Sequence, residues 1–173
     1  MIYFGALWST PTLDSFEELL KSYSAMVRRI VNAYERESGH VDDLVQEVWL
    51  AIWRAMPAFK NQSSLRTYIA RIAQNVSVTH VRKSLRFKPS PLVDEYFDPK
   101  PSVGEADEHA TDLLRLVEAV QSLPISLKEV ATLYLENMPI QEIAAALSIT
   151  ENTASVRLVR AKAALKRTIR GDR

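Results

Sequence analysis

The sequence contains no cysteine and only four glycines among its 173 residues. The lack of cysteine excludes disulfide bonds and thiolate chemistry, and it suits a reducing cytoplasm. With so few glycines and few alternating β-branched runs, a sheet protein is not expected. No apolar run approaches the length of a membrane span, and the N-terminus lacks a basic segment followed by an apolar stretch. We therefore expect neither membrane insertion nor a secretion signal.

The usual signatures of an enzyme are also missing. No glycine-rich phosphate loop, nucleophile–base pairing or catalytic pair of carboxylates stands out. The histidines His40, His80 and His109 lie far apart and lack the spacing of metal ligands. We therefore expect no catalytic activity, no metal and no cofactor.

Acidic residues are absent from one long stretch of the chain. No Asp or Glu occurs between Val48 and Val93. The cations that accumulate there are Arg54, Lys60, Arg66, Arg71, Arg82, Lys83, Arg86 and Lys88. Residues 1–88 contain 12 Lys or Arg and 8 Asp or Glu. The corresponding numbers of basic and acidic residues are 1 and 7 in residues 89–112, and 9 and 6 in residues 113–173. A basic segment without internal anions predicts contact with a negatively charged partner such as nucleic acid.

Hydrophobic periodicity predicts an all-α protein with two small helical domains. Apolar residues recur at spacings of three and four along residues 42–56: Leu44, Val45, Val48, Trp49, Ile52, Trp53 and Met56. Ser15 is expected to cap the helix before this one, Asp42 or Asp43 to cap this helix, and Ser63 or Ser64 to cap the next. The predicted divisions are an N-terminal domain at 1–88, an acidic, proline-containing linker at 89–110 and a C-terminal domain at 111–173.

The C-terminal domain has the pattern of a helix-turn-helix. A short alanine-rich helix opened by Pro139 is followed by a tight turn at residues 148–150 and a longer basic helix. Its second helix would enter the major groove by its N-terminal end. The side chains placed to reach bases or phosphates are Glu151, Asn152, Ser155, Arg157, Arg160, Lys162 and Lys166. On periodicity alone, an ordinary surface helix with solvated cations remains an alternative.

Two motifs in this order resemble the sigma factors of bacterial RNA polymerase, in the extracytoplasmic-function (ECF) group of the sigma-70 family. DDLVQEVWLAIWRAMPAF with SSLRTYIARIAQN resembles their second region. LPISLKEVATLYLENMPIQEIAAALSITENTASVRLVRAKAAL resembles their fourth region. The resemblance covers about residues 14–170 and implies a region 2 helical bundle followed by a region 4 helix-turn-helix.

The resemblance also implies roles for individual residues. Those that match positions docking on the clamp helices of the largest polymerase subunit are Asp43, Gln46, Glu47 and Leu50. Those that match the loop and helix reading and opening the −10 element are Phe59, Lys60, Asn61, Ser63, Ser64, Arg66, Tyr68, Arg71, Asn75, His80, Arg82 and Lys83. The helix from Glu151 matches the reader of the −35 element, and the acidic linker matches the segment that threads toward the polymerase active site and RNA exit path.

Some positions depart from the family pattern. Ser148 and Asn137 stand where glycine is frequent, Thr79 where Asp is frequent, and Gln74 where Arg is frequent. Asn tolerates a left-handed backbone, whereas Ser does so less readily. These departures bear on promoter preference more than on the class of protein.

The resemblance implies a transcription initiation factor without catalysis of its own. Its expected partners are core RNA polymerase, through the clamp helices and the flap, promoter DNA, and an anti-sigma factor. It is expected in the cytoplasm, where an anti-sigma factor could hold it at the inner membrane. The alternative is a helix-turn-helix regulator that binds duplex DNA without polymerase core. A decoy that only occupies a sigma partner should have lost the cations at Arg157, Arg160 and Lys162, and it has kept them.

Overall fold

The structure is a computed structural model that describes residues 13–86 and 108–170. Within these ranges the chain forms seven α-helices and one short 3₁₀ helix, and no strand. The helices are α1 (Leu13–Asn32), α2 (Ser38–Ala55), η1 (Met56–Ala58), α3 (Leu65–Arg86), α4 (Glu108–Gln121), α5 (Ile125–Leu135), α6 (Ile140–Leu147) and α7 (Glu151–Arg170). The prediction of an all-α fold is confirmed. None of these helices combines the length and the apolar character that crossing a bilayer requires.

Helices α1, α2 and α3 form the N-terminal unit around the predicted apolar stripe of α2. Leu44, Val48 and Ile52 are fully buried. Phe16 of α1 packs its ring edge-on against Trp49 and Trp53, with ring centroids 5.7 and 4.8 Å apart. Because one face of α2 is occupied in this way, the opposite face is left for solvent or a partner.

Helices α4 to α7 form the C-terminal unit, which contains the predicted helix-turn-helix. The small residues Ala154 and Ala161 of α7 are fully buried and let this helix lie close against the unit. Asn137 and Ser148 both adopt the left-handed backbone conformation, with φ of 57° and 55°. Each therefore turns the chain at the end of a helix, where a glycine would be the unstrained choice.

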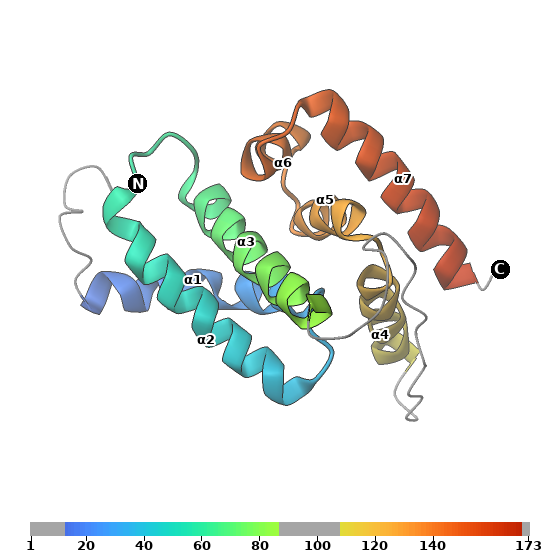
Figure 1. Cartoon of the computed structure of the whole chain (residues 1–173), viewed down its shortest axis with the longest axis horizontal. Helices are drawn as coiled ribbons and strands as arrows, with labels where there is room; N and C mark the ends of the chain where they lie inside the picture. Colours follow the sequence, from blue (N-terminus) through green and yellow to red (C-terminus); the bar gives the residue numbers. More distant parts are fainter. Residues whose placement is uncertain (1–12, 87–107, 171–173) are drawn as a thin grey trace.

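The two units pack against each other in the described residues. In Figure 1, α3 lies between α1 and α2 on one side and α5 and α6 on the other. One continuous cluster of buried apolar side chains extends from Leu19 to Ala154. Gln74 and Val78 of α3 are buried. Gln74 takes part in the contact between the units, because its side-chain amide donates to the carbonyl of Glu129 in α5 at 3.3 Å.

Several predicted helix starts need correction. Helix α1 begins at Leu13, so Ser15 lies inside the helix and does not start it. Helix α2 begins at Ser38, which puts Asp42 and Asp43 beyond its first turn. Ser64 does cap α3, since its hydroxyl accepts the amide hydrogen of Thr67 at 3.1 Å.

The first helix of the C-terminal unit begins earlier than expected. Helix α4 begins at Glu108, inside the segment predicted as a linker, and residues 89–107 of that segment lie outside the described residues. Leu113, Leu114 and Val117 of α4 recur at the spacing of an inner helix face, yet their side chains are exposed. The periodicity therefore found the helix but not its buried side.

Candidate nucleic-acid interface

The outer face of α2 gathers the four residues predicted to dock on a partner. Asp43, Gln46, Glu47 and Leu50 all have exposed side chains. Leu50 is 48% exposed, although it belongs to a helix whose other large apolar residues are buried or half-buried. An exposed leucine beside carboxylates is typical of a polar docking surface with an apolar anchor. The neighbouring Asp42 is not part of this surface, because it forms an ion pair with Arg28 at 2.7 Å.

The loop between η1 and α3 places an aromatic pair beside polar side chains. The rings of Phe59 and Tyr68 lie 4.8 Å apart, and the Tyr68 hydroxyl donates a hydrogen bond to the carbonyl of Ala55 at 2.9 Å. Asn61 takes a left-handed conformation with φ of 54°. A hollow lies between this loop and α6, lined on the α6 side by Ala145 and Ala146. The loop is therefore held by its own contacts and borders a space in which a base could stack.

The predicted −10 residues on the loop and α3 divide into two groups. In the first, the side chains are exposed: Lys60, Asn61, Ser64, Arg71, Asn75, Arg82 and Lys83. In the second, the side chains are half-buried: Phe59, Ser63, Arg66, Tyr68 and His80. The structure thus brings an exposed cationic surface to α3, as the sequence predicted, and engages the other residues in packing or hydrogen bonds.

His80 is held by a carboxylate of the same unit. Its Nε2 lies 2.9 Å from Oε2 of Glu35. Burial alone would raise the pKa of the Glu35 carboxyl, but hydrogen bonds from the amides of Glu37 and Arg36 and from His80 outweigh it and lower the pKa. The imidazole is thereby oriented toward the end of α1, so this contact would have to break before His80 could point at DNA.

Helix α7 presents the predicted −35 residues along its exposed side. The exposed side chains are those of Glu151, Asn152, Ser155, Arg160, Lys162 and Lys166, whereas Arg157 is half-buried. The hydroxyl of Thr150 caps the helix by accepting the amide hydrogen of Thr153 at 3.1 Å. The first turn of α7 is therefore fixed at the end that would enter a major groove.

Two cations of the α7 group have partners on α5. The Lys162 ammonium lies 4.0 Å from the ring centroid of Tyr134, a cation–π contact. Burial raises the pKa of the Glu129 carboxyl, while the positive charges of Arg157 and Arg82 oppose the rise. Arg157 is thus close enough for its charge to act on Glu129, whereas Arg160 and Lys166 form no ion pair among the described residues.

Sequence reasoning missed a set of polar residues at the contact between the units. Thr67, Gln74, Lys128 and Glu136 are all buried, and Glu142 is half-buried. Lys128 donates to the carbonyl of Gln121 at 2.8 Å, and its ammonium lies 5.4 Å from the centroid of the Tyr34 ring. No periodic signal marks them, because polar residues at these positions are ordinarily expected on a solvated surface.

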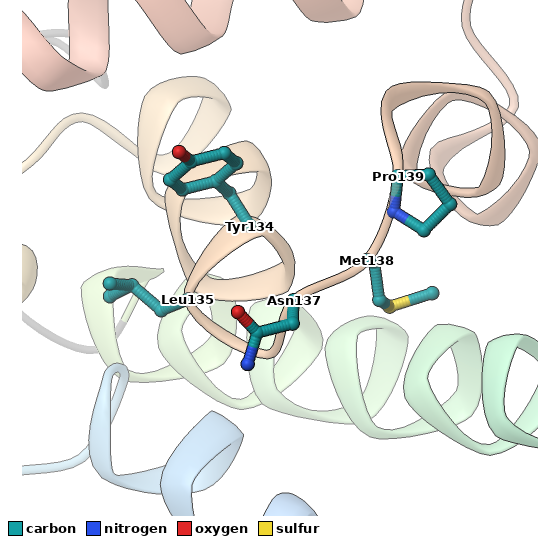
Figure 2. Close-up of a pocket in the computed structure, with 5 residues that line it drawn as sticks. All are labelled: Tyr134, Leu135, Asn137, Met138 and Pro139. Carbon is teal, nitrogen blue, oxygen red and sulfur yellow. The ribbon is translucent and has the colours of Figure 1, made fainter.

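The corner between α5 and α6 holds a second, shallow hollow. It is lined by Tyr134, Leu135, Asn137, Met138 and Pro139, which Figure 2 shows around the turn. These five side chains include no acid–base pair that could do catalysis. Among the described residues, no group of three or more His, Cys, Asp or Glu side chains could hold a metal ion.

The comparisons with known families match two parts of the chain. Residues 19–87 match the family described as Sigma-70 region 2, and residues 113–165 match that described as Sigma-70, region 4. The ECF RNA polymerase sigma-E factor of Escherichia coli K12 is 30% identical over 162 residues, which are 87% of this chain and 84% of the relative. The ECF RNA polymerase sigma factor SigM of Mycobacterium tuberculosis is 22% identical over 156 residues, 90% of this chain and 77% of the relative.

Two solved structures share the fold. CnrH in complex with the cytosolic domain of CnrY superposes with a TM-score of 0.68 at 21% identity, covering 94% of this chain and 92% of that one. The sigma factor RpoE in complex with the anti-sigma factor NepR from Bartonella quintana gives a TM-score of 0.70 at 19% identity, covering 93% and 100%. At these identities the similarity concerns the arrangement of helices.

Proposed function

The chain belongs to the sigma-70 family of RNA polymerase sigma factors, in its ECF group, and we propose that it places core polymerase on promoters through three separate surfaces. As a member of this family it is a transcription initiation factor. Because both regions match in one chain, the alternative of a helix-turn-helix regulator acting without polymerase is set aside. The observation that carries the proposal is that the three sets of predicted residues lie on three separate parts of the fold: α2, the loop before α3 together with α3, and α7.

The first surface is the exposed face of α2, which we assign to the clamp helices of the largest polymerase subunit. Asp43 and Glu47 are one helical turn apart, and the exposed Leu50 follows one turn later on the same face. Acidic groups at the rim of a contact steer association and fix register, while the apolar side chain supplies buried area. Region 4 would make the second polymerase contact, at the flap.

The second surface is the loop before α3 and the exposed side of α3, which we assign to the −10 element. The exposed cations Lys60, Arg71 and Arg82 would hold the phosphates of the separated strand. Extruding a base costs a few kcal/mol. The Phe59–Tyr68 pair beside the loop hollow provides an aromatic surface that offsets this cost by stacking.

The third surface is the first half of α7, which we assign to the −35 element. Asn152 and Ser155 are exposed near the capped end, where side chains reach base edges. Arg160 and Lys166 lie farther along and would contact phosphates without reading sequence. Base readout and phosphate contact are thus separated along one helix.

An inhibitor is the remaining expected partner. The two structural neighbours were solved with the cytosolic domain of CnrY and with the anti-sigma factor NepR, respectively. We extend this to an anti-sigma factor for the present chain, which would keep it in the cytoplasm or at the inner membrane until a signal releases it.

The docking assignment is tested by reversing one charge on α2. Asp43→Arg should weaken binding to purified core polymerase about ten-fold or more, because Asp43 is exposed and makes no ion pair among the described residues. Binding would be measured by fluorescence anisotropy of the labelled chain, with thermal unfolding to show that the fold is unchanged. Glu17→Arg, an exposed charge reversal on α1, is the matched control. Equal core affinity of Asp43→Arg and the wild-type chain would exclude the α2 face as the docking surface.

A further inference from the structure

Two valines lie on the outer side of α7, among the residues assigned to the −35 element. The side chain of Val156 is 42% exposed, and that of Val159 is 68% exposed. On a solvated helix surface a valine is less favourable than alanine, lysine or arginine, because its branched side chain loses rotational freedom in a helix. Helix formation therefore does not explain two exposed valines on one face.

The two valines lie on the face of α7 that points away from the rest of the protein. Ala154 and Ala161, two helical turns apart, are fully buried and mark the inner side of this helix. Because successive residues of an α-helix are about 100° apart, Val156 and Val159 lie on either side of the line opposite these alanines. In Figure 1, the helices α4, α5 and α6 all pack on one side of α7. The valines therefore face away from the described helices that pack on α7.

The valines are continuous with the polar side chains assigned to base readout. Val156 lies one helical turn after Asn152, and Val159 lies one turn after Ser155, so the four exposed side chains form one surface. We call this surface the reading facet: Asn152, Ser155, Val156 and Val159. Its two polar residues come first along the helix, and its apolar half lies directly beside them. One surface can thus offer hydrogen bonds and apolar contact to adjacent base pairs.

Cations flank the apolar half of the reading facet on both sides. Around the helix, Arg160 lies next to Val156, whereas Lys162 lies on the other side, next to Ser155. Both cationic side chains are exposed. In a major groove, phosphates line the two edges and base edges form the floor. An apolar strip between two cations therefore fits duplex DNA in the way that the groove requires.

We propose that Val156 and Val159 determine part of the −35 specificity by contacting the C5 methyl groups of thymines in the major groove. Thymine is the DNA base that presents a methyl group on this edge, whereas cytosine presents an amino group there. A valine side chain can make an apolar contact with the methyl group but can form no hydrogen bond with the amino group. This inference rests on the assignment of α7 to the −35 element and adds two residues and a class of base to it.

The size of the effect follows from the burial of one methyl group. Thymine and uracil differ only in that group, and both pair with adenine. Removing one methyl group from water changes a binding constant about four-fold. Each thymine that contacts a valine should therefore be preferred over uracil about four-fold, and the preference should disappear when the valine is shortened to alanine.

The experiment uses the complex of core polymerase with this chain, bound to a promoter that the complex transcribes. Promoter duplexes carry uracil in place of one −35 thymine at a time, on either strand. Each duplex competes with a fluorescein-labelled promoter duplex, and anisotropy gives the relative affinity. For the wild-type complex, uracil should weaken binding about four-fold at one or two positions. With Val156→Ala or Val159→Ala, the thymine and uracil duplexes should bind equally at the position that the altered residue contacts.

The same helix provides a matched control. Ile169→Ala also removes an exposed apolar side chain from α7, but in the last turn, far from the reading facet. It should keep the wild-type preference for thymine at every position. Alanine is a better helix former than valine or isoleucine, so all three variants should stay folded, which circular dichroism checks.

Two results would overturn the proposal. The wild-type complex could bind thymine and uracil duplexes equally at every −35 position, a result that an element without thymine would match. Alternatively, Val156→Ala and Val159→Ala could both keep the thymine preference of Ile169→Ala. A failure of the proposed function has a different signature, because promoter affinity would then not depend on any base pair of the −35 element.

Discussion

The buried Lys128 should give the chain's folding stability an unusual dependence on pH. This lysine is 7% exposed and lies in α5 at the contact between the units, where its ammonium donates to the carbonyl of Gln121 and faces the Tyr34 ring. Burial, with a smaller contribution from the positive charge of Arg36, lowers the pKa of Lys128 from 10.5 to about 8. The charged form is therefore less favourable in the folded state than in the unfolded chain.

The size and direction of the change in stability with pH follow from the two pKa values of Lys128. One pKa unit corresponds to about 1.4 kcal/mol, so the buried charge costs about 3 kcal/mol of the free energy of unfolding at neutral pH. Below pH 8 the lysine is charged in both states, and the cost is constant. Above about pH 8 the folded state loses the proton that the unfolded chain still binds, so stability rises with pH. Tyr34 sets the upper limit, because burial raises its pKa well above 10.0 and stability falls once the unfolded chain loses that proton.

Urea unfolding, followed by helical circular dichroism at a series of pH values, measures this effect. The wild-type chain should gain about 2 kcal/mol between pH 8 and pH 10, and Lys128→Met should remove the gain. Lys21→Met, at an exposed position of α1, should leave the wild-type curve unchanged. A flat wild-type curve over this range, or an equal rise in Lys128→Met, would refute the assignment of a buried charged lysine.

Two further predictions concern helix capping and DNA readout. Ser64→Ala should lower the free energy of unfolding by about 1 kcal/mol in urea unfolding, because the Ser64 hydroxyl caps α3 through the Thr67 amide. Ser63→Ala, the control, should have little effect. Equal losses of stability in the two variants would contradict the capping role. Asn152→Ala should change which −35 bases are preferred in a selection from random duplexes. Arg160→Ala should instead weaken binding to all duplexes, and the slope of the logarithm of the binding constant against the logarithm of the salt concentration should fall in magnitude by about 1. An unchanged base preference in Asn152→Ala would contradict the assignment of the first turn of α7 to base readout.

The parts of the fold that sequence predicts well are those governed by local patterns. The apolar stripe of α2 is strictly periodic, and the residues predicted to be buried at Leu44, Val48 and Ile52 are buried. The helix-turn-helix is equally local, because Pro139 and the Ser148 turn mark its boundaries. Periodicity and turn chemistry act within a few residues and need no knowledge of the rest of the chain.

The parts that sequence did not predict depend on contacts between distant segments. Ser15 has the spacing of a capping box with Glu18, yet the helix continues back to Leu13, so a local signal did not decide the boundary. Gln74 was noted only as a departure from the family pattern, and its burial follows from the packing of α5 and α6 on α3. The pairing of Arg29 with Glu136 spans 107 residues and leaves no periodic trace. The exposed cations of α3 could therefore be predicted from residue type, whereas the contact of α3 with α5 and α6 could not.

Run-off transcription with purified core polymerase on a library of promoters shows whether this chain acts as a sigma factor. Transcripts should depend on this chain and share one pair of −35 and −10 sequences. Asp43→Arg should abolish them, whereas Glu17→Arg should not. Sequence-specific binding to duplex DNA in the absence of core, with no transcripts in its presence, would contradict the claim that the chain acts as a sigma factor.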